Sequence, residues 1–204
     1  MSEKIYLYPV WTRLWHWTNA ILCLLLIITG VSMQYSDPAY PMIRFDWAVS
    51  IHDVAGIMLA LSYAGFILGN VLTPNGRHYI FRKGILKNLF AQARYYAFGI
   101  FKRESPPFPI TEASKFNPLQ KFSYIVIMHV VIPLVVISGI ALFFPELIVF
   151  DVFGNKALHI TDIIHVIMGF VISLFLVVHL YFCTIGCTPT SNFRGMFTGY
   201  HEKH

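Results

Sequence analysis

The feature that most limits the possible folds is the apolar run at residues 162–186, DIIHVIMGFVISLFLVVHLYFCTIG, which carries no charge after Asp162. Such a run is long enough to cross the hydrocarbon core of a membrane, roughly 30 Å thick, as one helix. At about 100° and 1.5 Å per residue, His165 and His179 fall near one helical face and about 21 Å apart along it. One such histidine could be a packing residue. Because polar groups inside a membrane are costly and usually functional, two on one face predict ligand sites near both membrane boundaries, the geometry of two stacked haems.

The composition extends this interpretation to the whole chain. Of its 204 residues, 56% are hydrophobic, which is typical of an integral membrane protein rather than of a soluble domain. The segment before the first apolar run lacks the features of a cleaved signal, so we expect that run to be retained. We predict an all-α fold, in which residues 1–204 form a single integral membrane domain built as a four-helix bundle. The predicted transmembrane helices lie at about 14–33, 48–72, 122–144 and 163–185.

The basic residues indicate how the helices are oriented. All but two of the 15 lysines and arginines fall in the N-terminal segment, the connection between the second and third runs, and the C-terminal tail. The exceptions are Arg44 and Lys156, on a side that is otherwise acidic. The positive-inside rule then places both termini and the long connection in the cytoplasm. The net charge of +5 is therefore a topology signal, and it gives no reason to expect nucleic acid as a partner.

The long connection has an amphipathic pattern. Between Ile85 and Ile100, apolar residues recur at helical spacing and are flanked by basic ones. We expect a basic interfacial segment at about 77–117, with an amphipathic helix that lies on the cytoplasmic leaflet and is attracted to anionic lipid. A docking face for a soluble partner is the alternative.

The histidines of the apolar runs separate by depth. If the helices alternate in direction, His16 and His179 lie at the cytoplasmic level, and His52 and His165 at the outer level. A low-spin b-type haem needs two axial nitrogens from opposite faces of its ring, and a four-helix bundle can point both inward. We therefore predict that each level binds one haem b through its two histidines. Filled axial positions favour electron transfer over oxygen chemistry, whereas a metal transporter would need histidines that converge at one site.

Two further residues bear on these levels. Gly30 follows His16 by 14 residues, so it could make room for the outer haem or serve as a plain packing glycine. His129 precedes Pro133 by four residues and lies near the midplane, too deep for either level. We expect it to act as a hydrogen-bonding or proton-relay group between the cofactors rather than as a ligand.

The remaining candidate ligands are weaker. His78, His201 and His204 lie in polar segments, so we expect them to be solvated. Cys183 and Cys187 share one helix face, but two thiols make an incomplete metal site. No C-x-x-C-H motif occurs, so nothing indicates covalently attached haem.

Three stretches point to a family: TRLWHW, KFNPLQKFSY with SGIALFFPE beyond it, and TIGCTPTSNFRGMFTGYHE. Over nearly its whole length the chain resembles the di-haem cytochrome b membrane subunits of formate dehydrogenases (the gamma subunit), nickel-iron hydrogenases (the B-type cytochrome) and thiosulfate reductases. The resemblance implies the same four axial histidines, in a bacterial or archaeal cytoplasmic membrane. It also implies a site for menaquinone or ubiquinone at the cytoplasmic haem, near Asn117 and His179. Asn117 equally suits a helix N-cap before Pro118.

Together these features predict a membrane electron-transfer subunit with two haem b groups. We expect it to exchange electrons between a membrane quinone pool and an iron-sulfur or multihaem cytochrome c subunit of a respiratory oxidoreductase complex, without itself transforming a soluble substrate. One alternative is a haem relay between protein partners with no quinone site of its own. An alternative of another class is a haem-free membrane anchor or metal transporter.

Overall fold

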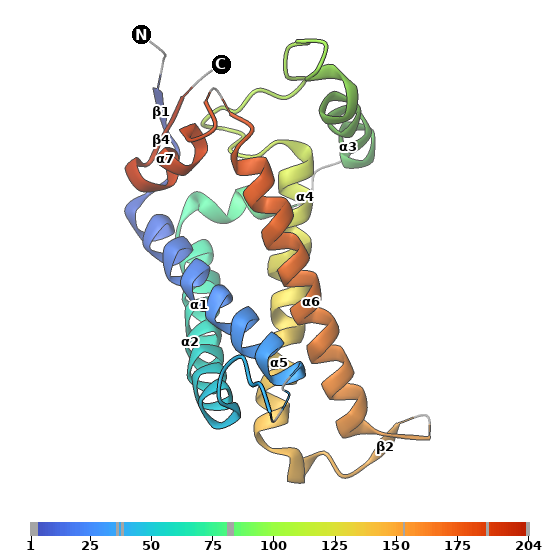
Figure 1. Cartoon of the computed structure of the whole chain (residues 1–204). Coiled ribbons are helices and arrows are strands. Elements are labelled where there is room, and N and C mark those ends of the chain that lie inside the picture. Colours follow the sequence, from blue (N-terminus) through green and yellow to red (C-terminus); the bar gives the residue numbers. More distant parts are fainter. Residues whose placement is uncertain are drawn as a thin grey trace.

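Four long helices, side by side, make up most of the molecule (Figure 1). The computed structural model describes residues 4–202, apart from residues 36, 38, 81–83, 153 and 187. Each long helix is apolar and long enough to cross a membrane, which confirms the predicted four-helix membrane bundle. The four spans are α1 (Val10–Gln34), α2 (Phe45–Leu72), the third span (Pro118–Phe143) and α6 (Ala157–Cys183).

The bundle consists of two helical hairpins. Helix α1 packs closely along α2, and the second half of the third span packs along α6, whereas contacts between the hairpins are few. Gly69 of α2 explains part of the first pairing, because a Cβ there would lie only 2.9 Å from the Trp11 ring. A Cβ on Gly65, the other glycine of the GFILG pattern, would meet nothing within 4 Å. Of the two glycines in the GFILG pattern, only Gly69 is therefore needed for the close approach of α1 to α2.

The third span contains a π turn. It comprises α4 (Pro118–Val126), η3 (Ile127–Val131) and α5 (Ile132–Phe143). Pro133 has no N–H for the carbonyl four residues earlier, and such a missing bond is one cause of a local π geometry. His129 lies in this turn, and its Nδ1 is 3.1 Å from the carbonyl oxygen of Ile125 on the same helix. Its side chain is exposed on the surface of the span, so the expected relay position between the two histidine levels is wrong.

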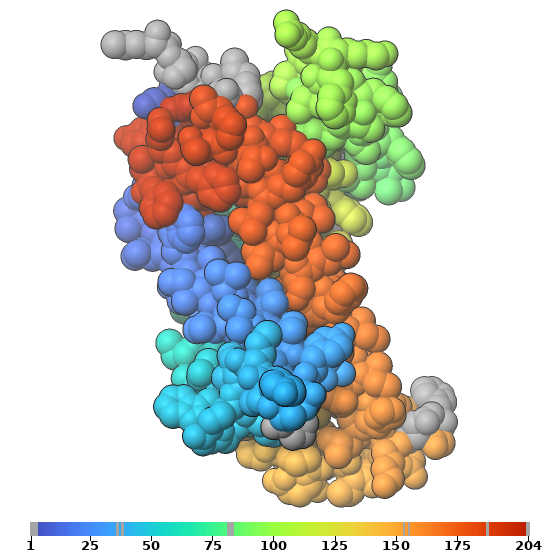
Figure 2. Space-filling model, viewed as in Figure 1, coloured from blue at the N-terminus to red at the C-terminus, as the bar shows by residue number. Residues whose placement is uncertain are grey.

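The core at mid-depth is small and apolar. Its buried members are Ile127, Val131, Ile132 and Ile172. Cys23, Ile27 and Tyr63, which are partly buried, pack against them. Ile172 stands midway between His165 and His179 on α6. Figure 2 shows the elongated surface, with α1 and α6 running along the face in view. Many large apolar side chains of the spans are exposed on the surface, as expected for contact with lipid tails.

The two chain termini pair with each other, which the sequence did not indicate. Strand β1 (Lys4–Tyr6) is antiparallel to β4 (Tyr200–Glu202), and α7 (Ser191–Thr198) precedes β4. Gly199 ends α7 with a φ of 89°, and a Cβ there would lie 2.6 Å from the Tyr6 ring, so the turn needs glycine. Two more strands, β2 (Asp151–Val152) and β3 (Asn155–Lys156), form a small hairpin before α6.

The long connection lies at the same end of the bundle as both termini (Figure 1). Its elements are η1 (Pro74–Tyr79), α3 (Ile85–Arg94) and η2 (Tyr95–Gly99). The helix expected from the apolar spacing is therefore present, and Phe90 on it is exposed. The basic segments gather at one end, as the charge pattern predicted. Which side of the membrane this end faces stays a prediction.

Candidate functional site

The four predicted histidines form two pairs. The rings of His16 on α1 and His179 on α6 have their centres 6.1 Å apart. The rings of His52 on α2 and His165 on α6 are also 6.1 Å apart. We call His16 and His179 the terminal pair, because they lie toward the end with the chain termini, and His52 and His165 the distal pair. The structure thus brings together the partners that depth along the helices predicted.

The ring separation suits one metal ion held between two imidazoles. A first-row metal lies about 2 Å from an imidazole nitrogen and so about 3 Å from the ring centre, which sets the two ring centres about 6 Å apart. Among the described residues, no group of three or more His, Cys, Asp or Glu side chains converges on one point. Each pair therefore suits a metal whose other ligands come from a macrocycle, as in bis-histidine haem.

The distal pair has a matching environment on both sides. Thr29 Oγ1 lies 2.9 Å from His52 Nδ1, and Ser138 Oγ lies 3.1 Å from His165 Nδ1. Each hydroxyl residue is followed by a glycine that faces the same imidazole. A Cβ on Gly30 would be 3.5 Å from His52 Cε1, and one on Gly139 would be 3.0 Å from His165 Cε1.

Two more glycines leave room beside the distal pair. Gly56 follows His52 by one helical turn, and Gly169 follows His165 in the same way. A Cβ at either position would meet no atom within 4 Å. A flat macrocycle between the imidazoles would also cover the helix surface one turn away, so both glycines fit the presence of haem.

The terminal pair has a different environment. His16 Nδ1 is buried and has no hydrogen-bond partner within the described residues. The His179 ring stacks on Phe175 at 5.6 Å, and its Nε2 lies 3.6 Å from Cys183 Sγ. Cys187, the other thiol of the pair considered above, lies outside the described residues. A buried nitrogen without a hydrogen-bond partner is unfavourable by about 1–3 kcal/mol, a cost that neither distal imidazole bears at its Nδ1.

Comparison with known proteins agrees with this geometry. Residues 7–199 match the model of a family described as prokaryotic cytochrome b561. The chain belongs to this family. It is also 39% identical over 202 residues to YdhU of Escherichia coli strain K12, a protein described as a candidate cytochrome, with coverage of 98% of this chain and 76% of that protein. The protein is therefore a membrane cytochrome that uses b-type haem for electron transfer.

Asn117 of this cytochrome is the N-cap of α4, which was one of the two roles predicted for it from the sequence. Its Oδ1 accepts a hydrogen bond from the Gln120 backbone N–H at 2.9 Å, which completes a capping box. Its Nδ2 donates to the Tyr96 hydroxyl at 2.9 Å. The Tyr96 ring in turn packs on Phe182, with 4.8 Å between ring centres, near the end of the helix that carries His179. No sequence pattern indicates Tyr96, because its contact with Asn117 depends on how the long connection folds back.

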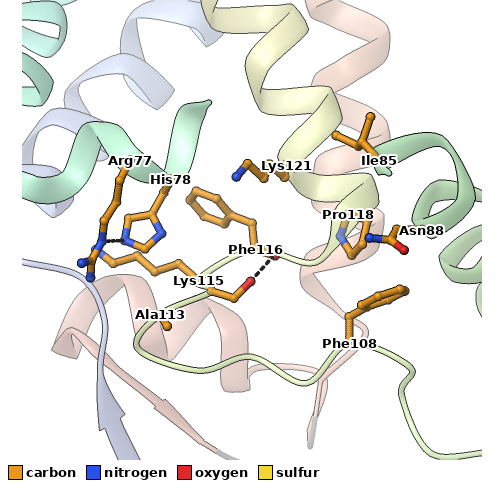
Figure 3. A pocket seen from close by; sticks show the side chains of 11 residues that line it. Arg77, His78, Ile85, Asn88, Phe108, Ala113, Lys115, Phe116, Pro118 and Lys121 are labelled. Carbon is orange, nitrogen blue, oxygen red and sulfur yellow. Dashed lines mark hydrogen bonds between the residues drawn. The ribbon is translucent and has the colours of Figure 1, made fainter. Parts of the chain in front are cut away.

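The same end of this cytochrome has a basic cavity (Figure 3). Its volume is about 190 Å³, and its lining includes Arg77, His78, Lys115 and Lys121. His78 is 5% exposed, and its Nε2 accepts a hydrogen bond from Arg77 Nε at 3.3 Å. The expectation that His78 is solvated is therefore wrong, because η1 folds back against the start of α4. The Asn117 side chain does not line this cavity, although both of its chain neighbours do.

Proposed function

We propose that this cytochrome carries two haem b groups, one between each histidine pair, and exchanges electrons between a membrane quinone pool and a partner redox subunit. The observation that supports it best is the equal 6.1 Å ring separation of two pairs at two levels of one bundle. Bound haem would supply reversible one-electron chemistry at its iron. Filled axial positions leave no place for a substrate at the metal, so electron transfer alone remains.

The protein's own residues would fix and insulate the two positions. His16 and His179 would hold the haem at the terminal level, and His52 and His165 the haem at the distal level. The apolar core around Ile172 lies between the levels and would exclude water and ions from the middle of the bundle. By the positive-inside rule the terminal level would face the cytoplasm and the distal level the outer side.

The quinone site would lie at the terminal level, beside Asn117 and Tyr96. A quinone carbonyl needs a hydrogen-bond donor, and its reduction needs protons from water at a membrane boundary. The Tyr96 hydroxyl accepts a hydrogen bond from Asn117, so its own hydrogen is available to donate. Burial raises the pKa of Tyr96, which keeps the hydroxyl protonated at neutral pH. Menaquinone and ubiquinone both carry the carbonyl that this donor would bind.

The partner subunit would dock at the distal end, beside the level at which His52 and His165 would hold the second haem. An iron-sulfur or multihaem cytochrome c subunit docked there would complete an electron-transfer path from one side of the membrane to the other. The long connection would keep its interfacial position against lipid, with the exposed Phe90 of α3 directed into the leaflet.

Quinol-dependent reduction of a soluble acceptor by the isolated, haem-loaded protein tests the quinone site. Tyr96→Phe removes the hydroxyl and leaves the α4 cap intact, and Tyr95→Phe is the neighbouring control. Loss of one hydrogen bond worth about 0.5–1.5 kcal/mol predicts turnover about 2- to 13-fold lower for Tyr96→Phe alone. Asn117→Ser keeps a capping oxygen but removes the amide donor, so it should reproduce the loss. Full turnover and inhibitor sensitivity in both Tyr96→Phe and Asn117→Ser would instead favour a haem relay without this quinone site.

A further inference from the structure

The hydroxyls beside the distal pair can only accept hydrogen bonds from the imidazoles. Thr29 Oγ1 donates to the Leu25 carbonyl at 2.7 Å, and Ser138 Oγ donates to the Leu134 carbonyl at 2.7 Å. A hydroxyl has a single hydrogen, and here a backbone carbonyl already receives it. With the hydroxyl hydrogen directed to that carbonyl, the hydrogen bond to the imidazole requires a proton on the ring nitrogen that faces the hydroxyl. Both Thr29 and Ser138 are almost fully buried, so water does not offer an alternative partner.

This arrangement selects one tautomer for each distal histidine. With Nδ1 protonated, the lone pair of His52 and of His165 lies on Nε2, where a metal can bind. The following glycine lets each imidazole approach, since a Cβ on Gly139 would press against His165 at 3.0 Å. Thr29–Gly30 and Ser138–Gly139 thus act alike from two different helices. In each, the hydroxyl accepts the hydrogen bond from Nδ1, and the glycine leaves room for the ring.

We propose that Thr29 and Ser138 are positioning residues that fix the tautomer of the distal ligands and make them stronger donors to iron. The proposal rests on the proposed function, because it concerns the haem between His52 and His165. A hydrogen bond from Nδ1–H raises the basicity of a ligating imidazole, and a more basic ligand favours the oxidised metal. Within the described residues no hydroxyl is hydrogen-bonded to the terminal pair: His16 Nδ1 has no partner, and the contact of His179 is between its Nε2 and the Cys183 thiol. The asymmetry lowers the midpoint potential of the distal haem relative to the terminal one and so favours electron flow toward the terminal level.

Redox titration of the two spectral components tests this proposal. Thr29→Val keeps the shape of the side chain and removes the hydroxyl, and Ser138→Ala removes the other. Each should raise the midpoint potential of the distal component, leave the terminal component unchanged and weaken distal haem binding by about 10- to 100-fold. The rescue variant Thr29→Ser, which keeps a hydroxyl, should restore the potential. Matched controls are Thr161→Val and Ser173→Ala, because both hydroxyls donate to the carbonyl four residues earlier and neither is hydrogen-bonded to a histidine within the described part of the chain.

A measurement on the haem-free protein distinguishes a failure of this proposal from a failure of the proposed function. Nitrogen-15 NMR of labelled histidine should find His52 and His165 in the Nδ1–H form, and Thr29→Val should weaken that preference for His52. An Nε2–H form in the wild-type protein, or a distal potential unchanged in both hydroxyl variants, overturns the proposal while two haems per chain leave the proposed function intact. A wild-type protein that binds fewer than two haems contradicts the proposed function itself.

A different observation, the basic cavity of Figure 3, supports a second proposal. Of the described residues that line it, Arg77, Lys115 and Lys121 are cationic and none is acidic. Lys115 is held in place by Asn75, whose Oδ1 accepts from Nζ at 3.0 Å. Burial and the nearby Arg77 lower the pKa of Lys115, and an anion in the cavity would oppose this shift because it would stabilise the charged ammonium. Ile85, Phe108 and Phe116 add apolar walls.

We infer that this cavity binds the phosphate headgroup of an anionic phospholipid. It lies between η1, helix α3 and the start of α4, next to the ends of the second and third spans, and basic pockets at this depth suit such headgroups. The apolar walls fit the first carbons of the acyl chains. A bound lipid would join α3 to the bundle by contacts that the protein alone does not make.

Native mass spectrometry after exchange into nanodiscs tests this inference. Phosphatidylglycerol should be retained in preference to phosphatidylcholine, and Arg77→Gln or Lys115→Gln should weaken retention about fivefold each. Lys87→Gln is the matched control, since Lys87 is an exposed cation of α3 outside the cavity. Equal retention of both lipids, or an equal loss in Lys87→Gln, overturns the inference. So does competition by millimolar inorganic phosphate that removes the preference, because it would show a site for soluble anions.

Discussion

Replacement of Gly56 by leucine should block the distal haem without harming the helix. A Cβ at Gly56 would meet nothing within 4 Å, so the haem-free protein has space for the new side chain. Glycine is also about 0.8–1.0 kcal/mol less favourable than alanine inside a helix, so helix propensity does not oppose the change. With haem between His52 and His165, the same side chain would press on the macrocycle. Overpacking of this kind costs about 1–3 kcal/mol, which corresponds to about 5- to 150-fold weaker haem binding.

The control is Gly65→Leu on the same helix. Gly65 is equally unobstructed, but it is exposed on the surface and lies on another face from His52. Haem titration of the purified haem-free variants, followed by absorbance, should show one weakened component for Gly56→Leu and none for Gly65→Leu. Equal haem affinity in the two variants would refute the argument that the space beside Gly56 belongs to the cofactor.

Other expected outcomes concern the same levels and the orientation of the chain. His52→Ala and His165→Ala should each remove the same spectral component, and His16→Ala should remove the other; loss of one shared component in all three would refute the pairing. Gly139→Ala should weaken distal haem binding more than Gly30→Ala, because its Cβ would be 3.0 Å rather than 3.5 Å from the imidazole, and haem titration measures the difference. A reporter active only outside the cytoplasm should be silent at the C-terminus and active in the loop between the third and fourth spans, and the reverse pattern would invert the topology.

The sequence was sufficient to predict the membrane spans and the histidine pairs, because both depend on helical periodicity. Residues 14 apart on one helix share a face, and alternating helices bring His16 to the level of His179. It was insufficient where the rotation of one helix against another decides the contact. Thr29 and Ser138 meet their imidazoles because α1 packs on α2 and α5 on α6. The repeated hydroxyl–glycine pair was nevertheless visible in the sequence and could have marked both positions.

Contacts between remote segments were the hardest to predict. Strands β1 and β4 are three residues each and pair across almost the whole chain, so no local pattern indicates them. Tyr96 and His78 likewise acquire their surroundings only when the long connection folds against α4. His129 lies on the exposed face of its span because a single helix has a definite rotation about its axis, which depth alone does not determine.

The haem content per chain tests the central claim most directly. A pyridine haemochrome assay, with protein concentration from amino-acid analysis, should give two b-type haems for the wild-type protein. The double variant with His52→Ala and His165→Ala should retain one, held by the terminal pair. A wild-type value of one, or a double variant that still holds two, would contradict the assignment of one haem to each pair of imidazoles.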